Sequence, residues 1–129
     1  SEFPVAMEAA IAARDAGVAV IAGAPNIVRG GSHSGNVSAA DLVRAGAADA
    51  FASDYVPASM IEAAWRTAAE TGISLPAAVA MIAEAPARMA RLPDRGRLEA
   101  GLRADLVQVR PVHDIPVVRR VWREGSRVA

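Results

Sequence analysis

Cysteine is absent from the 129-residue sequence. Neither a disulfide framework nor a cysteine-ligated zinc site can therefore form. The absence is in keeping with a cytoplasmic protein, and the cytoplasm is where we expect this chain to act. Residues 1–4 contain no basic segment followed by an apolar core, so we expect no secretory signal peptide in this sequence.

Aromatic residues, net charge and long apolar runs are also scarce. Aromatics make up 4% of the sequence, and alanine supplies much of its 53% hydrophobic content, so the core should consist of small side chains in closely packed helices and strands. The 14 basic and 14 acidic residues cancel, which argues against a general nucleic-acid-binding face but leaves room for a local anion site. Charged residues or glycine interrupt the apolar runs well short of a membrane span.

Helix and strand patterns alternate along roughly the first two-thirds of the sequence. The helices are expected at residues 4–16, 38–44, 58–70, 75–83 and 86–91, and the strands at 18–22 and 50–53. Such alternation is typical of βα units around a parallel sheet. Two clear strands, or three if the chain begins at the end of one, leave the sheet edges uncovered. We therefore expect a piece of a larger α/β fold.

The last part of the chain has a different pattern. A strand is expected at 104–110 and a hairpin at 117–128, with Pro111 and Pro116 bracketing the connection between them. We place the boundary near residue 93, which divides the chain into 1–93 and 94–129. The hairpin arginines are interpreted as a solvated strand face or as edge protection, with no functional role.

Asp54 is the sharpest candidate for chemistry, because it follows an apolar strand and precedes a proline-led helix. A carboxylate at that position can bind a metal or accept a proton from a metal-bound water. The alternative is an N-terminal cap of the next helix. Tyr55 and Glu2 are further candidates, although a glutamate at a helix start also suits the helix dipole.

The expected loop at 23–37 is rich in small hydrogen-bond donors, and this composition predicts a phosphate-binding site. Glycine amides can form an anion nest, and an arginine can grip phosphate in bidentate fashion. The candidate phosphate-binding residues are Arg29, Gly30, Gly31, Ser32, His33, Ser34 and Asn36. The alternative is an ordinary long loop, since no Walker lysine follows. His33 is also a candidate catalytic residue, whereas His113 is interpreted as structural or exposed.

Several segments resemble the amidohydrolase superfamily. Residues 101–109 (GLRADLVQV) resemble its closing motif, residues 117–128 its final hairpin, and residues 85–88 a helix start in which Ala85 replaces the usual Asn. The resemblance implies an α/β fold: the C-terminal part of a metal-dependent (β/α)8 barrel at 1–93, followed by antiparallel strands of a small β-sandwich at 94–129.

Residues 1–4, 23–37 and 53–57 are more specifically similar to the phosphonate-metabolism branch of that superfamily, in the carbon–phosphorus lyase pathway. That branch releases pyrophosphate from a ribose triphosphate that bears an alkylphosphonate. The resemblance implies a divalent metal, for which we expect zinc, with Asp54 as metal ligand and proton acceptor. It also implies that Arg29 and His33 bind phosphate or protonate the leaving group.

The resemblance covers essentially the whole chain but only the C-terminal third of such an enzyme. The His-x-His pair of the first barrel strand and the ligands of the middle strands are absent. We therefore expect the isolated chain to be inactive, and its exposed faces to be covered by a second copy or by the N-terminal part of the same enzyme. The alternative functions are a non-catalytic phosphate-binding module and a self-associating α/β module.

Overall fold

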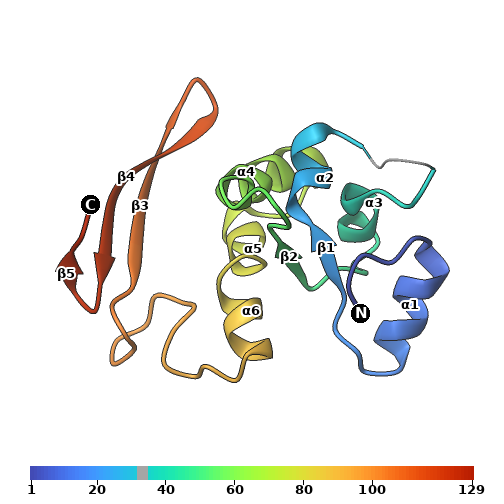
Figure 1. Ribbon diagram of the computed structural model, residues 1–129, viewed down its shortest axis with the longest axis horizontal. Helices are drawn as coiled ribbons and strands as arrows, with labels where there is room; N and C mark the ends of the chain where they lie inside the picture. The colour runs from blue at the N-terminus through green and yellow to red at the C-terminus, as the bar shows by residue number, and fades with distance from the viewer. Residues whose placement is uncertain (32–34) are drawn as a thin grey trace.

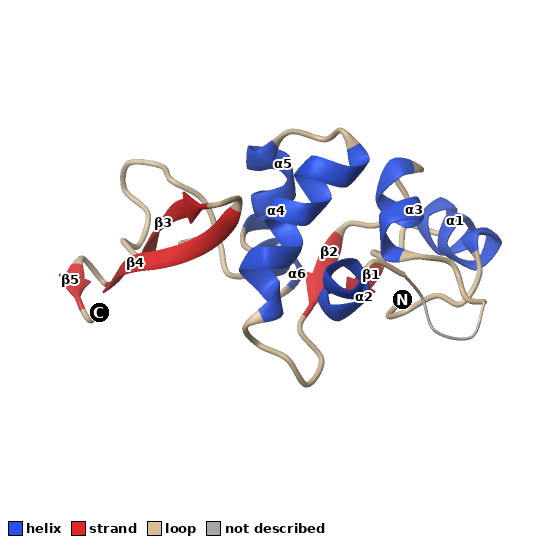
Figure 2. Cartoon of the chain, turned by 90° about the horizontal axis from the view of Figure 1, so that it is seen from above, coloured by secondary structure: helices blue, strands red, loops and turns tan. Residues whose placement is uncertain are grey.

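The computed structural model describes residues 1–31 and 35–129. It has a mixed α/β arrangement with one parallel and one antiparallel sheet. In chain order the elements are α1 (Met7–Asp15), β1 (Ile21–Gly23), α2 (Ala24–Arg29), α3 (Ala39–Arg44), β2 (Ala50–Ala52), α4 (Ser59–Thr71), α5 (Leu75–Ala80), α6 (Glu84–Met89), β3 (Leu106–Val112), β4 (Ile115–Arg123) and β5 (Ser126–Arg127). Figures 1 and 2 show α4, α5 and α6 between the two sheets.

The parallel pair is formed by β1 and β2, with Ile21 opposite Ala50 and Gly23 opposite Ala52. The start of the chain runs beside β1: the Ile21 N–H donates to the Ser1 oxygen at 2.8 Å and the Phe3 N–H donates to the Ile21 oxygen at 2.9 Å. Glu2 and Ile21 form a parallel bridge, so residues 1–3 take the place of the third strand that the sequence left open. The described residues form no closed barrel.

The same pairing corrects the first predicted helix. Residues 1–3 are extended against β1, and Ala6 is still extended, with φ −135° and ψ 151°. The helix α1 therefore begins at Met7 and not at Pro4. Proline suits a first helical turn, but here the backbone hydrogen bonds to β1 decide the boundary.

Small side chains fill the core around the parallel pair. Ala10, Ala24 and Ala63 are fully buried, and Val20 and Ile27 are among the largest side chains that are completely enclosed. This confirms the expectation of a core with few large groups, in which close approach of helices to strands supplies the packing.

The antiparallel sheet has the order β3–β4–β5. Its first hairpin turns at His113 and Asp114, whose φ angles are +49° and +63°. Pro111 and Pro116 pair with each other within the strands, so the connection is shorter than expected and lies wholly between the two prolines. His113 is exposed there, as expected.

Three side chains anchor this sheet at its other end. Asp105 Oδ1 accepts a hydrogen bond of 2.9 Å from the Glu124 backbone N–H. Arg103 forms ion pairs with both Asp105 and Glu124. The hydrogen bond from Glu124 is the main reason that the pKa of Asp105 lies below its ordinary value. The turn between β4 and β5 is thereby tied to the segment that leads into β3.

Candidate functional site

A depression of about 180 Å³ lies at the carboxyl edge of the parallel sheet. Because β1 and β2 are parallel, Gly23 and Ala52 end at the same edge, and the segments that follow them face one another across it. The lining residues are Phe3, Pro4, Ala22, Gly23, Pro25, Asn26, Arg29, Gly31, Asn36, Val37, Ala39, Leu42 and Asp54. The depression thus brings three segments together that are far apart in the sequence, at residues 3–4, 22–42 and 54.

The prediction of one continuous loop at 23–37 is wrong for its first part, because residues 24–29 form the helix α2. Pro25 lies in the first helical turn, and Gly30 ends the helix in a left-handed conformation with φ +76°. Proline near the start and glycine just past the end are ordinary helix-boundary signals, so the sequence did contain this information. Gly30, Gly31 and residues 35–37 are the described residues between α2 and the cap of α3 at Ser38.

The predicted phosphate-binding residues fall into three groups. Arg29, Gly31 and Asn36 line the depression. Gly30 does not line the depression and is the residue that ends α2. The predictions for Ser32, His33 and Ser34 fall outside the described residues and stay predictions.

Asp54 also lines the depression, directly after β2. It does not cap α4, since Ala58 occupies the cap position and no side chain bonds there. Within the described part of the chain, its carboxylate has neither a hydrogen bond nor an ion pair. Its φ of +50° is unusual for a residue other than glycine. The capping alternative is therefore wrong, and the carboxylate is available for a ligand.

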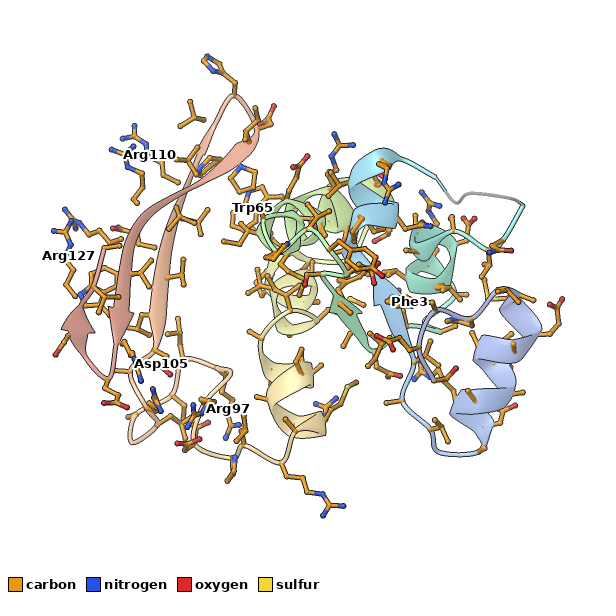
Figure 3. All side chains as sticks on the ribbon, viewed as in Figure 1. Phe3, Trp65, Arg97, Asp105, Arg110 and Arg127 are labelled. Carbon is orange, nitrogen blue, oxygen red and sulfur yellow. The ribbon has the colours of Figure 1, made fainter. Side chains whose placement is uncertain are left out.

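Gly23 and Asn26 are two of the lining residues that the sequence analysis did not single out as site residues. A Cβ atom on Gly23 would lie 3.3 Å from Asp54 Oδ2 and 3.5 Å from Phe3 Cε1. The missing side chain at Gly23 is what allows the carboxylate to approach the end of β1. The ring of Phe3 lies at this end of the parallel sheet (Figure 3).

Asn26 accepts two hydrogen bonds from residues that follow α2. Its side-chain Oδ1 accepts a hydrogen bond of 2.9 Å from the Ala39 N–H, at the start of α3. Its backbone oxygen accepts a longer bond of 3.3 Å from the Gly31 N–H. Asn26 therefore accepts hydrogen bonds from Gly31 and Ala39, one on each side of residues 32–34, and only the tertiary contacts reveal this role.

Glu2, Tyr55 and His113 do not line the depression. Glu2 serves in the backbone pairing with β1, and the Tyr55 side chain is 99% exposed. Among the residues that the structure describes, no three His, Asp or Glu side chains are grouped so as to hold a metal. Asp54 is the sole carboxylate in the described lining, so it fits one ligand of a metal and not a whole site.

The family model described as "Amidohydrolase family" matches residues 7–129. The chain belongs to the amidohydrolase family. This family generally uses a metal. None of the helices in the described parts of this amidohydrolase combines the length and hydropathy needed to cross a membrane.

This amidohydrolase is also similar to a curated protein, the "Alpha-D-ribose 1-methylphosphonate 5-triphosphate diphosphatase" of Escherichia coli (strain K12). The two are 47% identical over 130 residues, which cover 99% of this chain and 34% of the relative. The amidohydrolase chain thus spans about a third of the length of the curated relative it matches. The comparison with solved structures found no match.

Proposed function

We propose that this chain is the C-terminal part of a cytoplasmic, metal-dependent phosphoanhydride hydrolase of phosphonate catabolism. The proposed reaction releases pyrophosphate from alpha-D-ribose 1-methylphosphonate 5-triphosphate. The observation that carries the proposal is the carboxylate of Asp54, which lines one depression with Arg29 and Asn36 and has no structural partner within the described residues. The proposed substrate class comes from the name of the diphosphatase to which the chain is 47% identical.

The proposed architecture follows from the same placement. Residues 1–93 would be the last strands and helices of a (β/α)8 barrel, whose active site lies at the carboxyl ends of the strands. Residues 94–129 would be strands of a small β-sandwich. The parallel order of residues 1–3, β1 and β2 supports this assignment.

In the proposed mechanism the loop holds the triphosphate. Arg29 binds phosphoryl oxygens with its guanidinium fork, and Asn36 and the loop amides donate further hydrogen bonds. His33 would protonate the leaving group, and Ser32 and Ser34 would add hydroxyl donors. These donors act on charge that grows in the transition state, where their effect on rate is greatest.

Asp54 would orient the attacking water and accept its proton. It would also supply one ligand to the divalent metal, for which we propose zinc. That metal supplies Lewis-acid stabilisation of the phosphoryl oxygens when bound. The described residues offer no second carboxylate in the depression, so the remaining ligands are proposed to come from the N-terminal part of the enzyme.

The test is pyrophosphate release by the full-length enzyme carrying Asp54→Asn. We expect kcat to fall by about 10²–10⁴-fold, because the proton acceptor is lost, while the fold is unchanged by circular dichroism. Asp15→Asn is the matched control: Asp15 is exposed at the end of α1, away from the depression. Full activity of Asp54→Asn would contradict the proposal. Turnover by the isolated 129-residue chain would also contradict the proposal if Asp54→Asn abolished that turnover. The isolated chain is proposed to lack most of the metal ligands.

A second candidate is a non-catalytic phosphate-binding module. The single carboxylate in the described lining favours it, since hydrolysis needs more metal ligands than one. Saturable binding of pyrophosphate by the full-length protein, with no turnover of the triphosphate in zinc, manganese or magnesium, would support this candidate.

A further inference from the structure

A second depression, of about 380 Å³, lies on the three-stranded sheet and is separate from the first. Gln108, Arg110, Arg119, Arg120 and Arg127 line it, and we call them the sheet-face arginine cluster. They come from β3, β4 and β5. Figure 3 shows Arg110 and Arg127 on the side of the sheet that faces away from the helices. The cluster is therefore remote from the depression that holds Asp54.

A β-bulge explains why two consecutive arginines share one face. Gln108 pairs with Arg120, and Val109 pairs with Val118, so Arg119 is the extra residue on β4. In a regular strand Arg119 and Arg120 would point to opposite faces. The bulge leaves both lining the same depression.

The cluster is short of compensating negative charge. Among the described residues, no carboxylate lies within ion-pair distance of Arg110, Arg119 or Arg120, and Arg127 Nε donates to the backbone oxygen of Ala129 at 3.1 Å. The register places no two of these arginines directly opposite each other, but all four line one depression. Positive charge gathered in one depression raises the local concentration of anions.

Protection of a sheet edge accounts for part of the cluster. Edge protection places charges on edge strands. β5 pairs with Trp122 and Arg123 of β4, so in the described sheet Arg119 and Arg120 lie on a part of β4 that pairs with β3 alone. Edge protection does not by itself require that Arg119 and Arg120 converge with Arg110 and Arg127 in one depression, and the bulge brings that about.

We propose that the sheet-face arginine cluster binds a small polyphosphate anion, a di- or triphosphate group. Guanidinium forks match phosphate oxygens in bidentate fashion, and four of them suit a ligand with several negative charges. The Gln108 amide adds a neutral donor and acceptor. The zero net charge of the chain argues against a long nucleic acid, which requires an extended basic face. The inference does not depend on the proposed function, because no residue of the first depression takes part.

The test is calorimetric titration of the full-length protein with inorganic pyrophosphate, without divalent metal and at low ionic strength. The titrated protein also carries Arg29→Ala, which weakens pyrophosphate binding at the first depression. We expect saturable binding, and the double variant Arg119→Gln/Arg120→Gln should raise Kd about tenfold or more, because two charge-assisted contacts are lost. Arg123→Gln is the matched control: Arg123 lies on the same strand but does not line the cluster, and its Kd should change less than about twofold.

Arginine Nε–Hε resonances of the unsubstituted protein give a second readout that does not depend on the variants folding. Pyrophosphate should shift the resonances of Arg110, Arg119 and Arg120 and leave that of Arg123 in place. Absence of binding, equal Kd in the double variant and the control, or shifts spread evenly over all arginines would each overturn the proposal. Tighter binding of a glutamate-rich peptide than of pyrophosphate would also overturn it, in favour of an acidic protein partner.

Discussion

The substitution Gly96→Ala tests how the segment after α6 is locked against that helix. Gly96 has φ +99°, and a Cβ atom there would lie 2.7 Å from Ala87 Cβ, 3.0 Å from the Ala83 oxygen and 3.0 Å from Glu84 Cα. Two of these three atoms are backbone and the third is a buried methyl group, so none can move aside cheaply.

The magnitude follows from two separable costs. A left-handed conformation costs a non-glycine residue about 1–3 kcal/mol, and overpacking of this kind adds about 1–3 kcal/mol. The two costs sum to about 2–6 kcal/mol, and we expect Gly96→Ala to destabilise the protein by about 4 kcal/mol, the middle of that range. Gly101→Ala is the matched control, because Gly101 has φ +92° but no atom within 4 Å of the position of a Cβ. It should show only the first cost.

The assay is urea unfolding followed by the fluorescence of Trp65 and Trp122. With a urea m-value of about 2 kcal/mol/M, the midpoint of Gly96→Ala should fall by about 2 M, and that of Gly101→Ala by about 1 M, from the conformational cost alone. An unchanged m-value would show that both proteins unfold in the same way. Equal losses in the two variants would refute the reasoning, because the close contacts of Gly96 would then contribute nothing.

Two further predictions concern carboxylates at the surface. The pKa of Asp105 is lowered, chiefly by the Glu124 backbone N–H; its stabilising contribution is therefore present above about pH 4 and lost as the pH falls through the lowered pKa. Asp105→Ala should flatten the acid side of the profile of unfolding midpoint against pH, and an unchanged profile would contradict this. Ser38→Ala removes the cap of α3, should cost about 1 kcal/mol, and should raise the pKa of Asp41, which the Ser38 hydroxyl lowers. NMR titration measures that pKa, and Ser38→Thr, which keeps a capping hydroxyl, should behave like the unsubstituted protein.

The candidate site could be predicted only in part. Asp54, Arg29 and Asn36 were recognised because local features mark them: a carboxylate after a strand, and donors in a glycine-rich segment. Gly23 was missed because its importance depends on how closely the Asp54 carboxylate approaches it. Asn26 was missed because its bond to Ala39 crosses thirteen residues.

The prediction of the hairpin shows the same division. Its strands and turn were expected from local patterns, whereas its arginines were interpreted as a solvated strand face or as edge protection, with no functional role. A regular strand would place Arg119 and Arg120 on opposite faces. The bulge at Arg119 changes that alternation, and it arises from the pairing of β4 with β3.

The sequence by itself determined the alternation of helices and strands, the cap at Ser38, the small-residue core and the family motifs. These properties depend on side chains within a few positions of one another and on local backbone preferences. Only the tertiary structure decided that Asp54 faces Gly23, that Asn26 spans the loop, and that four arginines share one depression. Those outcomes depend on strand register and on contacts between distant segments, which are set by the packing of the whole chain.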